Sequence, residues 1–225
     1  MDTLEQDTVL GHTLTSDGKV LSLHRRGDLF EILIDGLELM SNRAHGSEQA
    51  LAAEVLPLLG TSKPTVLVGG LGMGYTLRAA LDVCGRTAQI HVCELFEEVV
   101  AWNRSTLAHI AGRPLDDPRV TVVVEDVARL IARSHGIYDA MLLDVDNGPE
   151  GLVLDRNDLI YEEEGLEKCR RALRPGGILA VWSSGPYRHF GERLKTCGFR
   201  MEHREVLALG DDGPRHSIYL GFLDG

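Results

Sequence analysis

A glycine-rich stretch, taken together with one later glutamate, constrains this chain more than any other feature. The apolar, strand-like run 65–68 is followed by four glycines, Gly69, Gly70, Gly72 and Gly74. A helical pattern then covers 75–83, and a second apolar run, 88–93, ends at Glu94. Glycines let the backbone turn tightly and approach a ligand, and an acid after the next strand can accept hydrogen bonds from ribose hydroxyls. The stretch therefore predicts a strand–helix–strand nucleotide site.

The spacing of the glycines indicates which nucleotide the site suits. A dinucleotide fingerprint would need a third glycine where Tyr75 stands, and a phosphate-binding P-loop would need a lysine that Tyr75–Thr76 lacks. The pattern G-x-G-x-G, with an acid after the second strand, is typical of a class I S-adenosylmethionine fold. The alternative is that the glycines only form a strand-to-helix turn, and the later acids speak against it.

Length and charge narrow the class of protein. The 225 residues fit one sizeable domain with a small appendage, and 23 basic against 34 acidic residues give a net charge of −11. An acidic chain is a poor candidate for binding nucleic acid. The nine histidines and four cysteines show no metal-ligand spacing, and no apolar run approaches a membrane span. We expect a cytoplasmic protein with reduced thiols, no metal, no nucleic-acid partner and no membrane contact.

Two regions differ in their patterns. Residues 8–40 read as short strands separated by turn signals, of which Asp35–Gly36 is the strongest hairpin signal. We therefore expect a small N-terminal β-meander over 1–44 and a Rossmann-like domain of the S-adenosylmethionine type over 45–225. Ser47 is expected to cap a helix over 47–59.

Strands and helices alternate through the second region. Strands are expected at 66–68, 90–93, 120–124, 139–143 and 178–182, and helices at 75–83, 96–110, 127–134, 162–173 and 187–197. The final strands, 200–208 and 216–223, have too short a connection for a crossover and must pair antiparallel. The predicted fold is α/β, a class I methyltransferase-like doubly wound, mostly parallel sheet with a C-terminal antiparallel hairpin.

Several acids follow strands at the edge where such sheets bind ligands. Asp126 directly follows an apolar run, so it could accept a hydrogen bond from an adenine amino group. It could equally cap the helix that starts at Val127, and both roles can hold together. Asp144, Asp146 and Asn147 follow the next strand, over the expected reactive end of the cofactor.

Asp144 is the residue that we expect to be catalytic. Alkylation of an amine by a sulfonium cofactor needs a neutral nitrogen in line with the transferred carbon. A free alkyl amine is mostly protonated at neutral pH, since a lysine-type amine has a pKa of about 10.4. A carboxylate must therefore hold the amine and lead its proton away.

The chain resembles the spermidine synthase family over about residues 18–185. The resemblance is carried by V-L-V-G-G-L-G-M-G-Y-T, the V-C-E strand end, E-D before a helix, Y-D-A-M-L-L-D with its Gly-Pro loop, and R-A-L-R-P-G-G. It implies that Glu94 binds ribose, Asp126 binds adenine and Asp144 is the catalytic aspartate, in a homodimer joined through the N-terminal strands. The full set of cofactor-binding residues expected on this basis is Gly70, Leu71, Gly72, Met73, Gly74, Glu94, Leu95, Asp126 and Val127, with Asp146 and Asn147 binding substrate.

The departures from the family pattern fall in the polyamine half of the site. Met73 stands where the family carries an aspartate that reads the free aminopropyl end of the cofactor. Asn147 replaces a second acid, although Asp146 lies beside it, and Ala52–Ala53 replace a Tyr-His pair. Each lost charged hydrogen bond is worth about 1.5–3 kcal/mol.

The leading hypothesis is a spermidine synthase-like transferase in polyamine biosynthesis that uses S-adenosylmethionine or its decarboxylated form to alkylate a small amine. Aminopropyl transfer, which yields methylthioadenosine, is the first choice. Met73 removes a carboxylate that would repel intact S-adenosylmethionine, so methyl transfer, which yields S-adenosylhomocysteine, stays open. A third possibility is a nucleoside-binding relative without catalysis, which Ala52–Ala53 and Asn147 would favour.

Overall fold

The structure is a computed structural model, and it describes residues 7–15, 17–145 and 158–225. The chain divides into two compact units, Met1–His45 and Gly46–Gly225. This division falls one residue after the boundary expected between 44 and 45. Among the described residues, no helix is both long and apolar enough to cross a bilayer.

The first unit is a four-stranded antiparallel meander. Its strands pair in chain order: β1 (Thr8–Leu14), β2 (Val20–Arg26), β3 (Leu29–Ile34) and β4 (Leu37–Ser41). Strands β3 and β4 are joined by Asp35 and Gly36, whose φ angles are 47° and 80°. Two successive positive φ angles suit the two-residue turns that match the twist of a hairpin, which is why the Asp-Gly pair predicted the hairpin correctly. Asp35 Oδ1 also accepts a hydrogen bond from Val20 N at 2.8 Å.

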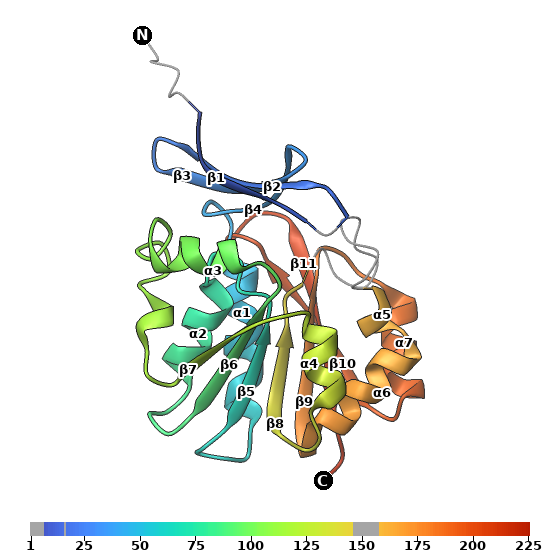
Figure 1. Cartoon of the computed structure of the whole chain (residues 1–225). Helices are drawn as coiled ribbons and strands as arrows, with labels where there is room; N and C mark the ends of the chain where they lie inside the picture. The colour runs from blue at the N-terminus through green and yellow to red at the C-terminus, as the bar shows by residue number, and fades with distance from the viewer. Residues whose placement is uncertain (1–6, 16, 146–157) are drawn as a thin grey trace. The chain divides into compact units, whose positions relative to one another are not determined.

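The second unit contains a seven-stranded sheet in the order β10-β11-β9-β8-β5-β6-β7 (Figure 1). The strands are β5 (Thr65–Gly69), β6 (Gln89–Glu94), β7 (Val120–Val124), β8 (Tyr138–Leu143), β9 (Leu173–Ser183), β10 (Arg200–Leu207) and β11 (Arg215–Phe222). All pairs from β7 to β9 are parallel, and β11 pairs antiparallel with both β9 and β10. The expected parallel sheet with a closing antiparallel hairpin is confirmed.

Helices cover both faces of this sheet. Figure 1 shows α1 (Gly46–Val55), α2 (Tyr75–Val83) and α3 (Glu97–Arg104) on one face. The other face carries α4 (Val127–Arg133), α5 (Asp158–Tyr161), α6 (Glu163–Ala172) and α7 (Arg188–Thr196). Short 3₁₀ turns, Leu56–Leu58 and Pro114–Asp116, complete the unit. The chain order reverses between β5 and β8, and in open α/β sheets ligands bind at the carboxyl edge beside such a switch point.

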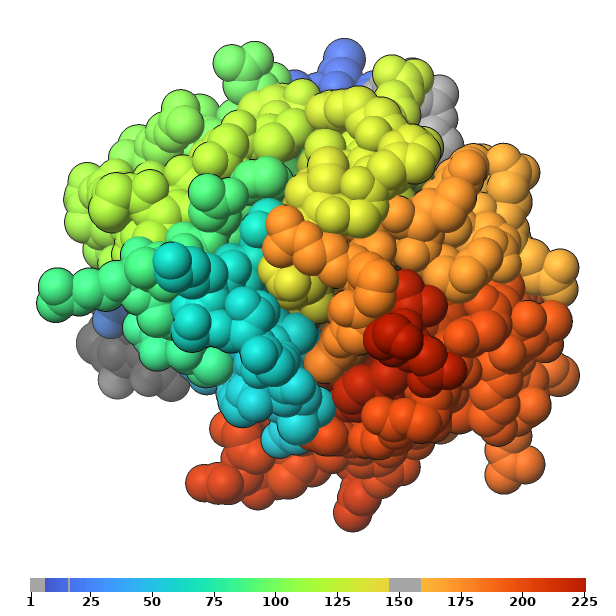
Figure 2. All heavy atoms as spheres, turned by 90° about the horizontal axis from the view of Figure 1, so that it is seen from below, coloured from blue at the N-terminus to red at the C-terminus, as the bar shows by residue number. Residues whose placement is uncertain are grey.

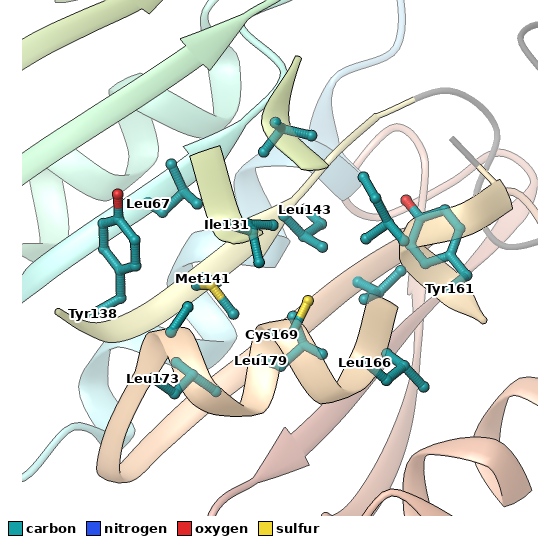
Figure 3. Close-up of a cluster of buried hydrophobic side chains, with 14 of the residues drawn as sticks. Leu67, Ile131, Tyr138, Met141, Leu143, Tyr161, Leu166, Cys169, Leu173 and Leu179 are labelled. Carbon is teal, nitrogen blue, oxygen red and sulfur yellow. The ribbon is translucent and has the colours of Figure 1, made fainter. Parts of the chain in front are cut away.

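A continuous apolar core lies between the sheet and the helices of the second face. Figure 3 shows Leu67, Met141 and Leu143 of the sheet facing Ile131 of α4 and Leu166 of α6. All five of these side chains are fully or almost fully buried. Burial of each large aliphatic side chain contributes about 1.5–3 kcal/mol, so this layer holds the strand ends, and hence the site, in place.

The amino edge of the sheet, opposite the ligand edge, is closed by polar contacts. Asp139 Oδ2 accepts hydrogen bonds from Thr65 N and from Arg174 Nη1, both at 2.7 Å. Figure 2 views this end, where the segments around residues 60 (cyan) and 175 (orange) lie side by side. Asp139 therefore joins β5, β8 and β9 at the edge away from the site.

Several expected boundaries were wrong. Ser47 lies inside α1, which begins at Gly46, so it is not the cap. The third helix ends at Arg104 instead of residue 110, since Ser105 Oγ donates to Ala101 O at 2.7 Å and the following residues form turns. Strand β9 begins at Leu173, five residues earlier than expected, because Leu173 already pairs with Tyr138.

Candidate functional site

The glycine stretch forms a tight loop between β5 and α2. Gly70, Gly72 and Gly74 have φ angles of 89°, 53° and 86°, which side-chain-bearing residues rarely adopt. A Cβ atom on Gly70 would lie 2.2 Å from the carbonyl oxygen of Asp144. Glycine is therefore required at position 70 for two reasons: the backbone is left-handed there, and it lies in close contact with the residue that follows β8.

Glu94 ends β6 with its carboxylate turned to this loop. Its Oε2 accepts a hydrogen bond from Leu71 N and its Oε1 accepts one from Phe96 N, both at 3.0 Å. The side chain is buried, and burial raises the pKa of its carboxyl, an effect that these backbone hydrogen bonds oppose. The backbone N–H groups of Leu95 and Gly72 also lower the pKa of this carboxyl, so the carboxylate lies among four backbone donors beside the loop.

Asn103 of α3 is a supporting residue that the sequence reasoning missed. Its Nδ2 donates to Gly72 O at 2.7 Å and to Val99 O at 2.9 Å, and the side chain is buried. A buried amide that satisfies a loop carbonyl holds that loop in one conformation. No local pattern marks Asn103, because the partner lies 31 residues earlier in the chain.

Asp126 caps α4, as one of its two expected roles required. Its Oδ1 accepts a hydrogen bond from Ala128 N at 2.7 Å. Asp126 also lines a cavity of about 350 Å³ between α4 and the α5–α6 pair. Val127 beside it is buried, whereas the nearby Leu95 keeps 45% of its surface exposed. The carboxylate therefore caps the helix and borders open space at the same time.

Asp144 follows β8 and meets the glycine loop from the other side. Its backbone N–H donates to Gly69 O at 2.8 Å, and its Oδ2 accepts a hydrogen bond from Thr76 Oγ1 at 2.7 Å. Burial raises the pKa of Asp144 to about 6, and the Thr76 hydrogen bond opposes that rise. Perturbed carboxyls of this kind are concentrated at catalytic and binding sites.

Glu48 of α1 is a second carboxylate of the site that the sequence reasoning missed. Burial, followed by the charge of Asp144, raises the pKa of Glu48 to about 8. Burial also raises the pKa of Tyr75 to about 12, with the Glu48 charge as the second cause. Glu48 lies in the segment from which only Ser47 and Ala52–Ala53 were singled out, and its neighbours Tyr75 and Asp144 belong to later parts of the chain.

Two of the positions that depart from the family pattern, Met73 and Ala52, have buried side chains. Met73 is almost completely buried, so it presents neither a charge nor an exposed side chain. Ala52 is fully buried in α1, while Ala53 is exposed. Asp146 and Asn147, the expected substrate-binding residues, lie outside the described residues.

The described part of the chain contains no group of three or more His, Cys, Asp or Glu side chains that could hold a metal ion. All four cysteines are free thiols. The carboxyl edge brings together a loop that allows close backbone approach, the carboxylates of Glu94 and Asp144, and the hydroxyl of Thr76.

The strand order, the reversal between β5 and β8 and the closing antiparallel hairpin define a class I methyltransferase-like fold. A family model described as the spermine/spermidine synthase domain matches residues 53–190, which is more than half of the chain. The chain belongs to the spermine/spermidine synthase family.

Individual relatives agree with this assignment. A polyamine aminopropyltransferase of Mycobacterium tuberculosis is 33% identical over 167 residues, which cover 72% of this chain and 30% of that protein. Spermidine synthase 2 of Arabidopsis thaliana is 31% identical over 162 residues, covering 70% of this chain and 45% of that protein. The chain thus spans less than half the length of these two relatives.

Solved structures support the fold. A spermidine synthase from Thermotoga maritima superposes with a TM-score of 0.76 at 19% identity, covering 95% of this chain and 72% of that one. A spermidine synthase in complex with the transition-state analogue AdoDATO gives the same TM-score at 18% identity, with the same coverage.

Proposed function

We propose that this protein transfers an aminopropyl group from decarboxylated S-adenosylmethionine to a small amine and releases methylthioadenosine. The observation that carries the proposal is the position of Asp144, a half-buried residue with a raised carboxyl pKa, in backbone contact with the glycine loop. Family membership and the aminopropyltransferase names of the relatives support this choice over the alternatives.

The residues present fit an adenosine. Glu94 would bind the ribose hydroxyls, because its carboxylate ends β6 beside the glycine loop. Asp126, at the start of α4, would accept a hydrogen bond from the adenine amino group. The exposed Leu95 and the buried Val127 would contact the faces of the base. The loop residues Gly70–Gly74 would approach the ribose and the sulfonium side chain.

Asp144 would hold the acceptor amine and receive its proton. When bound, the sulfonium donor supplies an electrophilic carbon, and the protein has to present a neutral nitrogen to it. A carboxyl with a pKa near 6 is mostly ionised at neutral pH, so it can attract the ammonium form and then act as a base. Thr76 fixes the orientation of that carboxylate through its 2.7 Å hydrogen bond.

Turnover assays with two donors would test the proposal. The purified protein should convert putrescine with decarboxylated S-adenosylmethionine and release methylthioadenosine. Product formed only with intact S-adenosylmethionine would indicate methyl transfer, for which the neutral, buried Met73 is the favouring observation. Binding of methylthioadenosine without product from any amine would indicate a nucleoside-binding protein that lacks catalysis.

We further propose that the protein forms a homodimer through its N-terminal meander and works in the cytoplasm. Strands β1 and β4 expose Val9, Leu14 and Leu37 at 56%, 66% and 72%, and apolar side chains on edge strands favour pairing. The four free thiols suit a reducing compartment. Sedimentation equilibrium of the whole chain against a Leu14→Lys, Leu37→Lys variant tests the dimer, which the variant should dissociate.

A further inference from the structure

The Thr76 hydroxyl links two acidic residues from distant parts of the chain, the carboxylate of Asp144 and the main chain of Glu48. Thr76 Oγ1 donates to Asp144 Oδ2 at 2.7 Å and lies 3.3 Å from the main-chain oxygen of Glu48. Their perturbed pKa values report the same proximity, because the charge of Asp144 acts on Glu48. Helix α1 therefore brings a second acid to the residue proposed as catalytic.

A polar chain continues from Glu48 to the end of the sheet. Ser47 Oγ lies 3.5 Å from Glu48 Oε2 and 2.9 Å from His216 Nδ1 of β11. Burial lowers the pKa of His216, which keeps its ring neutral at neutral pH. The other titratable groups facing Glu48 are Tyr75 and Asp144, and both are uncharged or negative. No described cation offsets Glu48, since Arg204, which packs near α1, pairs with Glu54.

Trp182 supplies an independent sign that this face of the site takes a ligand. Trp182 is 9% exposed, and its Nε1 is buried without a hydrogen-bond partner among the described residues. A buried donor of this kind is normally paired. Leu143 of β8 pairs with Val181 of β9, and both side chains belong to the core on the α4–α7 face. Side chains alternate along strands, so Asp144 and Trp182, one residue further on, face the opposite side together. The Trp182 ring lies 4.9 Å from that of His216, at the end of the polar chain.

We propose that Glu48 completes a two-carboxylate amine-binding site with Asp144, in which an incoming ammonium group replaces the proton that Glu48 holds at rest. This inference rests on the proposed function for its substrate class. The charge of Asp144 opposes ionisation of Glu48 and no described cation offsets it, so at neutral pH the resting pair carries mostly one proton and one negative charge. An ammonium ion supplies the missing positive charge and favours ionisation of both.

The proton balance of the reaction follows from this pair. The ammonium binds and Glu48 loses its proton towards solvent, for which Ser47 and His216 form a path. Asp144 then takes one proton from the ammonium, which leaves a neutral amine. The amine nitrogen forms the new carbon–nitrogen bond while the carbon–sulfur bond of the donor breaks, and the bonding electrons leave with sulfur. The product is a secondary ammonium ion, and Asp144 returns its proton to solvent.

Isothermal titration calorimetry can detect the exchange without any turnover. Putrescine is titrated into the whole protein saturated with methylthioadenosine, at neutral pH, in two buffers of different ionisation enthalpy. We expect the wild-type protein to release about one proton per amine bound, and Glu48→Gln to release less than about a third of that. We also expect Glu48→Gln to weaken amine binding at least about tenfold while the affinity for methylthioadenosine stays within about twofold.

Glu54→Gln is the matched control, because Glu54 lies on the same helix but pairs with Arg204. It should behave as wild type, and Glu48→Ala repeats the test if Glu48→Gln folds poorly. Equal proton release by wild type and both Glu48 variants, or no amine binding by the nucleoside-bound wild type, would overturn the inference. If Glu48→Gln turns over and matches wild type in proton release and amine binding, this inference alone is overturned. If proton release depends on Glu48 but the wild-type protein shows no turnover, only the proposed function is overturned.

Discussion

Replacing Glu94 by glutamine tests how the nucleoside is held. Glu94 accepts hydrogen bonds from backbone N–H groups on both carboxylate oxygens, at 3.0 Å each, and would also accept hydrogen bonds from the ribose hydroxyls. Glutamine keeps one oxygen and places an NH₂ group where the other stood. One N–H, from Leu71 or Phe96, would then face a second donor. The ribose hydroxyls would donate to a neutral amide oxygen instead of a charged carboxylate.

The expected size of the effect follows from these contacts. A hydrogen bond to a charged group contributes about 1.5–3 kcal/mol and a neutral one about 0.5–1.5 kcal/mol. Losing charge at the ribose and disturbing the loop should therefore weaken methylthioadenosine binding by about 1.4–2.8 kcal/mol, which is about 10- to 100-fold. The free energy of unfolding should change less, because a neutral glutamine avoids the cost of burying a charged carboxylate, which is the cost that raises the pKa of Glu94.

Isothermal titration calorimetry with methylthioadenosine measures the affinity, and urea unfolding measures the stability. Glu97→Gln is the matched control, since Glu97 is an exposed acid in the first turn of α3. The reasoning would be refuted by a Glu94→Gln protein that is folded and binds methylthioadenosine within about twofold of wild type.

Three further predictions follow from the carboxylates and the loop. The raised pKa values of Glu48 and Asp144 mean that the folded state binds more protons than the unfolded state between about pH 4 and pH 8, so their contribution to stability falls as pH rises. The urea midpoint of Glu48→Gln relative to that of wild type should therefore rise from about pH 5 to about pH 8. A relative midpoint that falls over this range would contradict the assignment. Asp144→Asn should lower kcat with putrescine at least about 100-fold while methylthioadenosine binding is retained, and an active variant would exclude Asp144 as the base. Gly70→Ala should cost at least about 2 kcal/mol of unfolding free energy and abolish nucleoside binding, because its Cβ would lie 2.2 Å from Asp144 O. Gly176→Ala, at a φ of 76° but with open space around it, should leave nucleoside binding unchanged and so separates backbone strain from the clash.

The central part of the fold was readable from local patterns. The glycine spacing, the apolar runs and Glu94 lie within one strand–helix–strand unit, and the structure has α2 at the expected residues, Tyr75–Val83. Asp144 could be found because it directly follows a buried strand, and parallel strands end at one edge. The short connection between the last two strands required the antiparallel hairpin that the structure contains.

Other boundaries depended on contacts that no local pattern reports. Strand β9 extends back to Leu173 because a neighbouring strand offers a partner there, and α3 stops at Arg104 although the apolar pattern continues. A partner on another strand decided where β9 begins, and a hydrogen bond from Ser105 back to Ala101 accompanies the end of α3, so propensity was a weak guide to both boundaries.

The sequence by itself determined the class of fold, the glycine loop and the acids that follow the strands, because each of these depends on residues that are neighbours in the chain. Only the tertiary structure brought Glu48 to Asp144 and Ser47 to His216, which lies 169 residues away in the chain. Those pairings exist because α1 packs beside α2 and against the sheet, and the pKa of an acid depends on burial and on charges nearby in space.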